Sequence, residues 1–259
     1  MKRLVLLRRM KTVIVVRASD LAAVCGKHPY RDQDDAVREV IARVRGGNRK
    51  ANEVRAANVL KNVSDDVKAE SAKVLGLKVQ DTPQLSVDLV TAIQKRAILS
   101  SSSTSSNPLP VSLPEQMKPV VEQQLRMAVG TVEETSILEL ATRTACINPE
   151  ASAPSSQVQI VDLAVTASGN VVRVVGVCDA LDRACVYEIK RRKSKLFHTI
   201  PTYERIQLES YLRMYDKMDG ALVEYYPEEG FDVHWVERDD SIWEELEMQV
   251  VEAFEARGY

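Results

Sequence analysis

Apolar residues recur with helical spacing in the first half of the chain and with strand-like spacing in the second. Between residues 31 and 118 they lie three or four positions apart, as on the buried face of a helix; they include Val37, Val40 and Val44, then Leu85 and Leu89. Glycines at 46–47 and at 76 are predicted to end helices. The serine- and proline-rich stretch at about 100–114 is predicted to be a flexible loop.

The second half predicts alternating strands and helices. Strands are expected at 157–165, 171–177, 185–190, 221–226 and 231–237, and helices at roughly 119–144 and 201–217. A final helix buries residues spaced four apart, from Ile242 to Phe254. This order indicates an α/β fold in which helices pack on a sheet that contains an antiparallel hairpin.

Composition narrows the class of protein without identifying a partner. The 259 residues are 45% hydrophobic and 28% charged with a net charge of −2, so a nucleic-acid surface would have to be local. The four cysteines form no CxxC pair, which disfavours a zinc ribbon and favours an intracellular, reducing compartment. No apolar run is long enough to span a membrane. The basic start, which lacks acids before Asp20, would also suit an organelle-targeting peptide.

Candidate chemistry lies where two predicted strands adjoin. Asp179 follows one strand, and Glu188 and Lys190 share a face of the next, with Ile189 turned away. Two carboxylates that share one lysine still repel each other, and a divalent metal ion would remove this repulsion. The pattern therefore predicts a divalent-metal site suited to phosphodiester hydrolysis.

Four segments, spread over residues 13–30 and roughly 125–255, carry a family pattern. They are Arg17-Ala-Ser-Asp20 with Gly26-Lys-His-Pro-Tyr30, then Gly130-Thr-Val-Glu-Glu134, then Asp179 with Glu188-Ile-Lys190, and last Gln207 with Tyr211. Together they resemble the PD-(D/E)xK nuclease superfamily, and most of all its lambda exonuclease and YqaJ viral-recombinase branch. The chain departs from the pattern at Cys178-Asp179-Ala180, where the family often has Pro-Asp-Gly.

The resemblance implies one nuclease domain over 1–259, with a restriction-endonuclease-like core at 119–259. A central mixed sheet would be flanked by helices, and residues 31–118 would form a helical insertion. The implied activity is digestion of double-stranded DNA from its ends, 5′→3′, in recombination or repair. A ring-shaped trimer and a single-strand annealing partner are also implied.

Site residues follow from the same resemblance. Asp179, Glu188 and Glu134, with the carbonyl of Ile189, would hold one or two Mg²⁺ or Mn²⁺ ions, and Lys190 would position the attacking water. Gln207 and Tyr211, four apart on one helix face, would support the site or the DNA.

Residues that could contact DNA are predicted at two further places. Ser19 is expected both to cap a short helix and to contact a terminal phosphate, with Arg17 and one of Arg8, Arg9 or Lys11 adding charge. The basic run at 191–195, which begins with Arg191 and Arg192, is expected beside the DNA backbone.

Two alternatives stay open. One is a structure-specific endonuclease on the same core, and another is a non-catalytic nucleic-acid-binding or assembly module. An iron–sulfur relative is disfavoured, because no cysteine follows Cys185. The three histidines, His28, His198 and His234, are scattered in sequence and suggest no metal cluster.

Overall fold

The computed structural model describes residues 12–78, 82–102, 113–144, 146–148, 150–154 and 157–259, with the backbone alone at 82, 99–102 and 126–135. Most of the predicted loop at 100–114, and the basic residues Arg8, Arg9 and Lys11, lie outside the described residues. The helices are α1 (Ala18–Val24), α2 (Gln33–Val59), α3 (Asp65–Val74), α4 (Thr82–Ser102), the 3₁₀ turn η1 (Glu115–Met117), α5 (Lys118–Arg143), α6 (Thr202–Met214) and α7 (Asp240–Glu255). The strands are β1 (Val13–Arg17), β2 (Gln159–Val165), β3 (Val171–Gly176), β4 (Ala180–Leu181), β5 (Cys185–Arg191), β6 (Asp219–Tyr226) and β7 (Gly230–Glu237).

The strands form two mixed sheets in place of the single central sheet that was expected. The first has the order β1-β3-β2, with β1 parallel and β2 antiparallel to β3. The second has the order β4-β5-β6-β7, in which only the β5–β6 pair is parallel. Mixed sheets flanked by helices confirm the predicted α/β class and are consistent with a restriction-endonuclease-like core.

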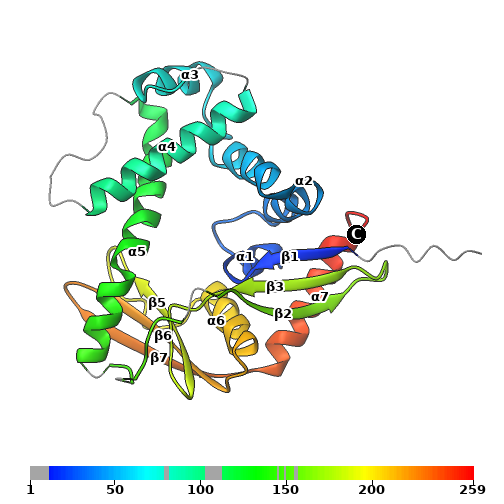
Figure 1. Cartoon of the computed structure of the whole chain (residues 1–259), viewed down its shortest axis with the longest axis vertical. Helices are drawn as coiled ribbons and strands as arrows, with labels where there is room; N and C mark the ends of the chain where they lie inside the picture. The colour runs from blue at the N-terminus through cyan, green and yellow to red at the C-terminus, as the bar shows by residue number, and fades with distance from the viewer. Residues whose placement is uncertain (1–11, 79–81, 103–112, 145, 149, 155–156) are drawn as a thin grey trace, which may run out of the picture.

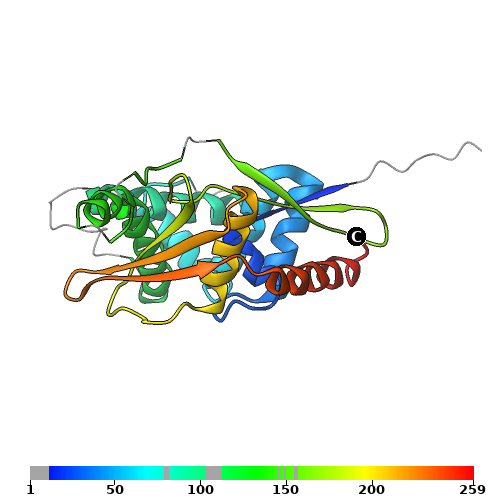
Figure 2. The same cartoon turned by 90° about the horizontal axis from the view of Figure 1, so that it is seen from below.

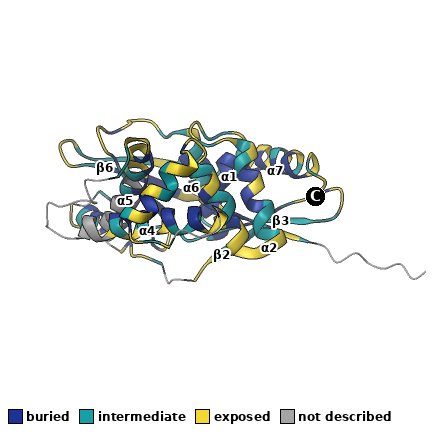
Figure 3. Cartoon of the chain, turned by 90° about the horizontal axis from the view of Figure 1, so that it is seen from above, coloured by how far each residue is buried: buried dark blue, intermediate teal, exposed yellow. Residues whose placement is uncertain are grey.

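One hydrophobic core lies beneath both sheets. Helices α1, α6 and α7 supply much of it, and they meet inward-facing residues of the first sheet such as Val172 and of the second such as Leu222. Figure 3 shows α1 and α6 as largely buried helices. Figure 2 shows α7 alongside the first sheet, where it packs against β2. The packing places α6 directly against the strands that carry the candidate chemistry.

The first half of the chain is helical, as predicted, and has its own small core. Leu60, Leu89, Ile93 and Met117 are fully buried there, in a cluster separate from the core beneath the sheets. Helix α2 is kinked at Gly46 and Gly47, where the predicted stripe ends; Gly47 has a φ of +68°. Helix α5 continues from this region down to β5 of the second sheet (Figure 1). The division into an insertion at 31–118 and a core at 119–259 stays a prediction.

Candidate active site

Strand β5 has one charged face and one apolar face. Tyr187 and Ile189 are buried on the side covered by Ile137 and Ala141 of α5. Glu188 and Lys190 lie on the opposite side, toward α6, where the Lys190 ammonium pairs with Glu188 Oε1. The predicted alternation along this strand is therefore confirmed, and only 2% of Glu188 is exposed.

Asp179 joins this pair from the neighbouring chain segment. It precedes β4, whose Ala180 is registered opposite Tyr187 in an antiparallel pair, so Asp179 comes alongside Glu188. Its Oδ2 accepts a hydrogen bond from the backbone amide of Ile189 at 2.7 Å. Asp179, Glu188 and Lys190 thus meet within one site, as the sequence predicts.

Among the described contacts, the Lys190 ammonium is the cation that interacts with both acids of the site. Burial raises the pKa of Asp179, against the opposing effects of Lys190, the Ile189 amide and a hydrogen-bonding interaction with Glu188. Burial also disfavours the Lys190 ammonium, but the charges of Glu188 and Asp179 outweigh it and hold the pKa of Lys190 above its usual range. Lys190 is therefore a cation at neutral pH rather than a proton acceptor.

Helix α6 supplies a bridging amide to the site. Gln207 Nε2 donates to Glu188 Oε1 at 2.8 Å and to the Tyr211 hydroxyl at 3.0 Å, since an amide carries two hydrogens. Burial raises the pKa of Tyr211, so its phenol stays neutral. The predicted shared face of Gln207 and Tyr211 is confirmed, and that face points at Glu188.

The other residues expected near the site have mixed outcomes. Ser19 is not a helix cap, because α1 begins at Ala18 and the cap position is Arg17, whose side chain makes no capping bond. Both residues are exposed. Glu134 lies in α5, but its side chain is outside the described part of the chain. The proposed roles of Ser19, Arg17 and Glu134 stay predictions.

The basic run after β5 divides into two environments. Arg192 is turned inward. Its guanidinium donates to Glu204 Oε1 at 2.7 Å and to Glu204 Oε2 at 2.6 Å, and it also pairs with Glu224. Only 7% of Arg192 is exposed, so the prediction that it contacts DNA does not fit its position. Lys193 and Lys195 are exposed and Arg191 is partly exposed.

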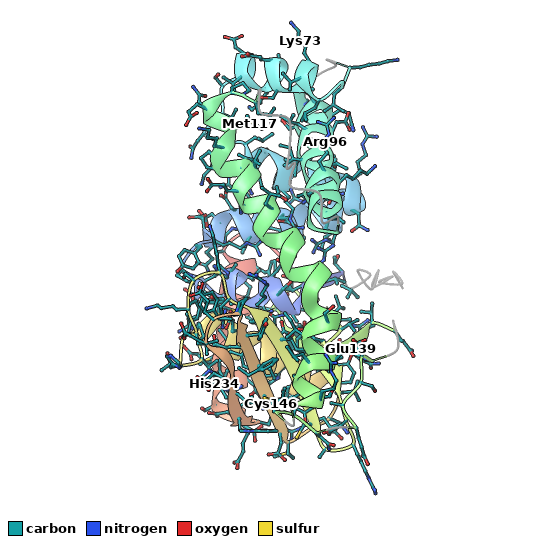
Figure 4. All side chains as sticks on the ribbon, turned by 90° about the vertical axis from the view of Figure 1, so that its left-hand side faces the viewer. Lys73, Arg96, Met117, Glu139, Cys146 and His234 are labelled. Atoms are coloured by element: carbon teal, nitrogen blue, oxygen red, sulfur yellow. The ribbon has the colours of Figure 1, made fainter. Side chains whose placement is uncertain are left out.

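Two of the three histidines are neighbours in space, contrary to their scattered sequence positions. His198 and His234 both approach Asp232, and His234 also approaches the buried Glu224. Sequence reasoning missed this group, because the register of the β6–β7 hairpin assembles it. The carboxylates and His234 could together hold a metal ion. Figure 4 shows His234 in the sheet region, far from Lys73 and Arg96 of the helical region.

Comparisons with known proteins add only weak similarity. No family model and no curated protein matches the chain. Among solved structures, a protein designated SSO0001 is 16% identical and aligns over 73% of this chain and 85% of its own, with a TM-score of 0.39. The alkaline exonuclease LHK-Exo of Laribacter hongkongensis is 13% identical over 74% of this chain and 92% of its own, with a TM-score of 0.37.

The same exonuclease in complex with dAMP is 15% identical over 73% of this chain and 85% of its own, with a TM-score of 0.38. These scores are too low to assign an activity.

Proposed function

We propose that the chain is a metal-dependent deoxyribonuclease that digests double-stranded DNA from its ends, 5′→3′. The observation that carries the metal-dependent hydrolysis is the group of Asp179, Glu188 and Lys190, whereas the end dependence and the 5′→3′ polarity are proposed from the sequence resemblance. Two partly or fully buried carboxylates meet there around one ammonium. Their formal charge is −1, and a divalent cation beside them would relieve the repulsion between the acids.

The donor atoms suit a hard divalent ion. Carboxylate oxygens are the ligands that Mg²⁺ and Mn²⁺ prefer. We propose that Asp179 and Glu188 hold one or two such ions, with Glu134 and the Ile189 carbonyl as further ligands. When bound, the ion relieves charge on the phosphate and acidifies water.

The remaining side chains would orient water or phosphate and hold Glu188 in place. The Lys190 ammonium can hold a water molecule or a phosphate oxygen in place, and it can stabilise negative charge that develops during hydrolysis. Gln207 fixes the rotamer of Glu188 through Oε1 and is itself fixed by Tyr211. This bracing keeps the metal-binding oxygens aligned without adding charge.

The substrate contacts are a separate part of the proposal. Ser19, Arg17 and Arg191 would bind phosphates, and the exposed lysines of the run after β5 would add sequence-independent attraction. A homotrimer, a single-strand annealing partner and a role in viral recombination or repair are proposed from the sequence resemblance alone.

The test uses linear duplex DNA labelled at each 5′ end beside a closed circle of the same sequence, with Mg²⁺ or Mn²⁺. We expect the linear form alone to be degraded, with progressive release of 5′ nucleotides, and chelation to stop the reaction. Nicking of the circle would move the assignment to an endonuclease. No cleavage with either metal would favour the binding module.

Two variants test the proposed roles of Lys190 and Glu188. Lys190→Ala should abolish turnover while largely sparing DNA affinity, whereas Lys73→Ala, at an exposed helix position, should leave both unchanged. Glu188→Gln should reduce Mg²⁺ or Mn²⁺ affinity as well as rate. Unaltered turnover in Lys190→Ala, or unaltered metal affinity in Glu188→Gln, would remove that residue from its role.

A further inference from the structure

The β6–β7 hairpin places two acids directly opposite each other. Glu224 is registered with Asp232, and Leu222 with His234, so both acids and the imidazole share one face of the sheet. Like charges directly opposite on neighbouring strands destabilise a sheet. Because Glu224 is fully buried, its repulsion with Asp232 is screened less by water and destabilises the sheet more. The pair therefore needs positive charge close by.

The nearest guanidinium is already shared. Arg192 bonds both carboxylate oxygens of Glu204 and also contacts Glu224. With neutral histidines, the group of Arg192, Glu204, Glu224 and Asp232 has three carboxylates and one cation, a formal charge of −2. One divalent cation would balance it.

Three donor atoms, on Glu224, Asp232 and His234, lie within 4.8 Å of one another beside Arg192, and His198 adjoins them through Asp232. His198 Nδ1 lies 2.9 Å from Asp232 Oδ2, His234 Nε2 lies 3.7 Å from the same oxygen, and His234 Nε2 lies 3.1 Å from Glu224 Oε2. In a tetrahedral zinc site, with ligand bonds of about 2.0–2.1 Å, neighbouring donor atoms are about 3.3 Å apart. The observed separations bracket that edge length.

Loop geometry brings His198 into this group from outside the hairpin. His198 has a φ of +60°, a left-handed conformation uncommon outside glycine. The amides of Phe197 and His198 both donate to Glu224 Oε2, at 3.0 and 3.3 Å. The segment between β5 and α6 is thereby attached to the buried acid.

We infer that His234, Asp232 and Glu224 form a binding site for a divalent transition metal of the zinc class, distinct from the carboxylate site around Glu188, with His198 as the hydrogen-bonding neighbour of Asp232. An imidazole among the ligands suits zinc, whereas magnesium prefers oxygen ligands alone. The ion would join β6 to β7 and hold the two acids that Phe197 and His198 contact, and so would fix the loop that carries Lys193 and Lys195. Its role is structural, and it does not depend on the proposed nuclease activity.

Because the chain has only three histidines, nuclear magnetic resonance can follow each imidazole. The full-length protein, stripped of metal with a chelator, is titrated with Zn²⁺ alone while the ring nitrogens are recorded. We expect one equivalent to shift His198 and His234 and to leave His28, which packs on Tyr203, unmoved. The thermal midpoint should rise in the same titration.

Variants separate this site from the proposed catalytic one. Asp232→Asn and His234→Gln should each weaken Zn²⁺ binding at least tenfold, while the exposed Asp219→Asn at the start of β6 should not. Glu188→Gln should leave the imidazole shifts intact, whatever its effect on DNA cleavage. Absence of shifts at 100 µM Zn²⁺, or shifts lost in Glu188→Gln and kept in Asp232→Asn, would overturn the inference.

Discussion

Replacing Arg192 tests whether this residue is an internal structural cation. Its guanidinium donates to both oxygens of Glu204 and contacts Glu224, and it lies 4.1 Å from the centre of the Phe197 ring. The Arg192 side chain is 8% exposed, while those of Glu204 and Glu224 are 4% and 0% exposed. Arg192→Met keeps the length of the aliphatic stem but leaves both acids without this partner.

The expected loss of stability is large. Removing one partner of a buried ion pair typically costs about 3–5 kcal/mol, because the remaining charge is buried without compensation. For a protein of this size that corresponds to a fall in the thermal midpoint of roughly 10 °C. A second change, Glu204→Gln, removes one of the two carboxylates that would be left without Arg192. The double variant Arg192→Met/Glu204→Gln should therefore recover about 1–2 kcal/mol of the lost free energy of unfolding.

The assay is urea unfolding in the presence of a chelator, so that bound metal does not contribute. Lys193→Gln, at the exposed position next to Arg192, is the matched control and should change stability by less than about 0.5 kcal/mol. A loss below 1 kcal/mol in Arg192→Met, together with weakened DNA affinity like that of Lys193→Gln, would refute the structural role and restore the predicted DNA contact.

Two further substitutions and one labelling experiment test the site and its surroundings. Gln207→Leu should lower turnover by about 10–100-fold with little change in thermal midpoint, because it removes the bond that orients Glu188; normal turnover would show that this brace is dispensable. Gly176→Ala should lower the free energy of unfolding by about 1–3 kcal/mol, because an added Cβ would lie 2.9 Å from Cε1 of the Tyr211 ring. Urea unfolding of the variant and the wild type measures this difference. Burial raises the pKa of Cys25 to about 12, so at pH 8 only about one Cys25 thiol in ten thousand is ionised. A thiol-alkylating reagent should therefore modify Cys25 far more slowly than the partly exposed Cys146, as measured by mass spectrometry. Equal rates of modification would contradict the burial of Cys25.

Local pattern predicts much of the structure around β5. The alternation of Tyr187, Glu188, Ile189 and Lys190 requires only a strand, and the short turn before it brings Asp179 alongside. The spacing of Gln207 and Tyr211 requires only a helix, so their shared face is also predictable. These features depend on contacts within about 30 residues of chain.

Long-range pairing was the part that sequence could not supply. The apolar run Val13–Val16 forms most of β1, but a run this short is compatible with either a strand or a buried helix, and its partners in the parallel strand β3 lie 158 residues away. The inward turn of Arg192 depends on acids in α6 and β6, so the basic run alone predicts a DNA contact at a position that is in fact buried. The histidine pair depends likewise on hairpin register.

Charge balance sets the candidate active site and the group around Arg192 apart from the remaining acids buried in the described chain. Glu209 has Arg205 and Arg213, and Asp20 and Glu39 are surrounded by Arg31, Arg43 and Arg55. Asp182 instead accepts from the Tyr187 hydroxyl and two backbone amides.

Those acids are matched by arginines or by several neutral donors, as buried charges require. Asp179 and Glu188, in contrast, share one lysine, and Gln207 adds a neutral donor without adding charge. The divalent ion proposed above would bring further positive charge to these two acids, whereas Glu209, Asp20 and Glu39 already contact arginines.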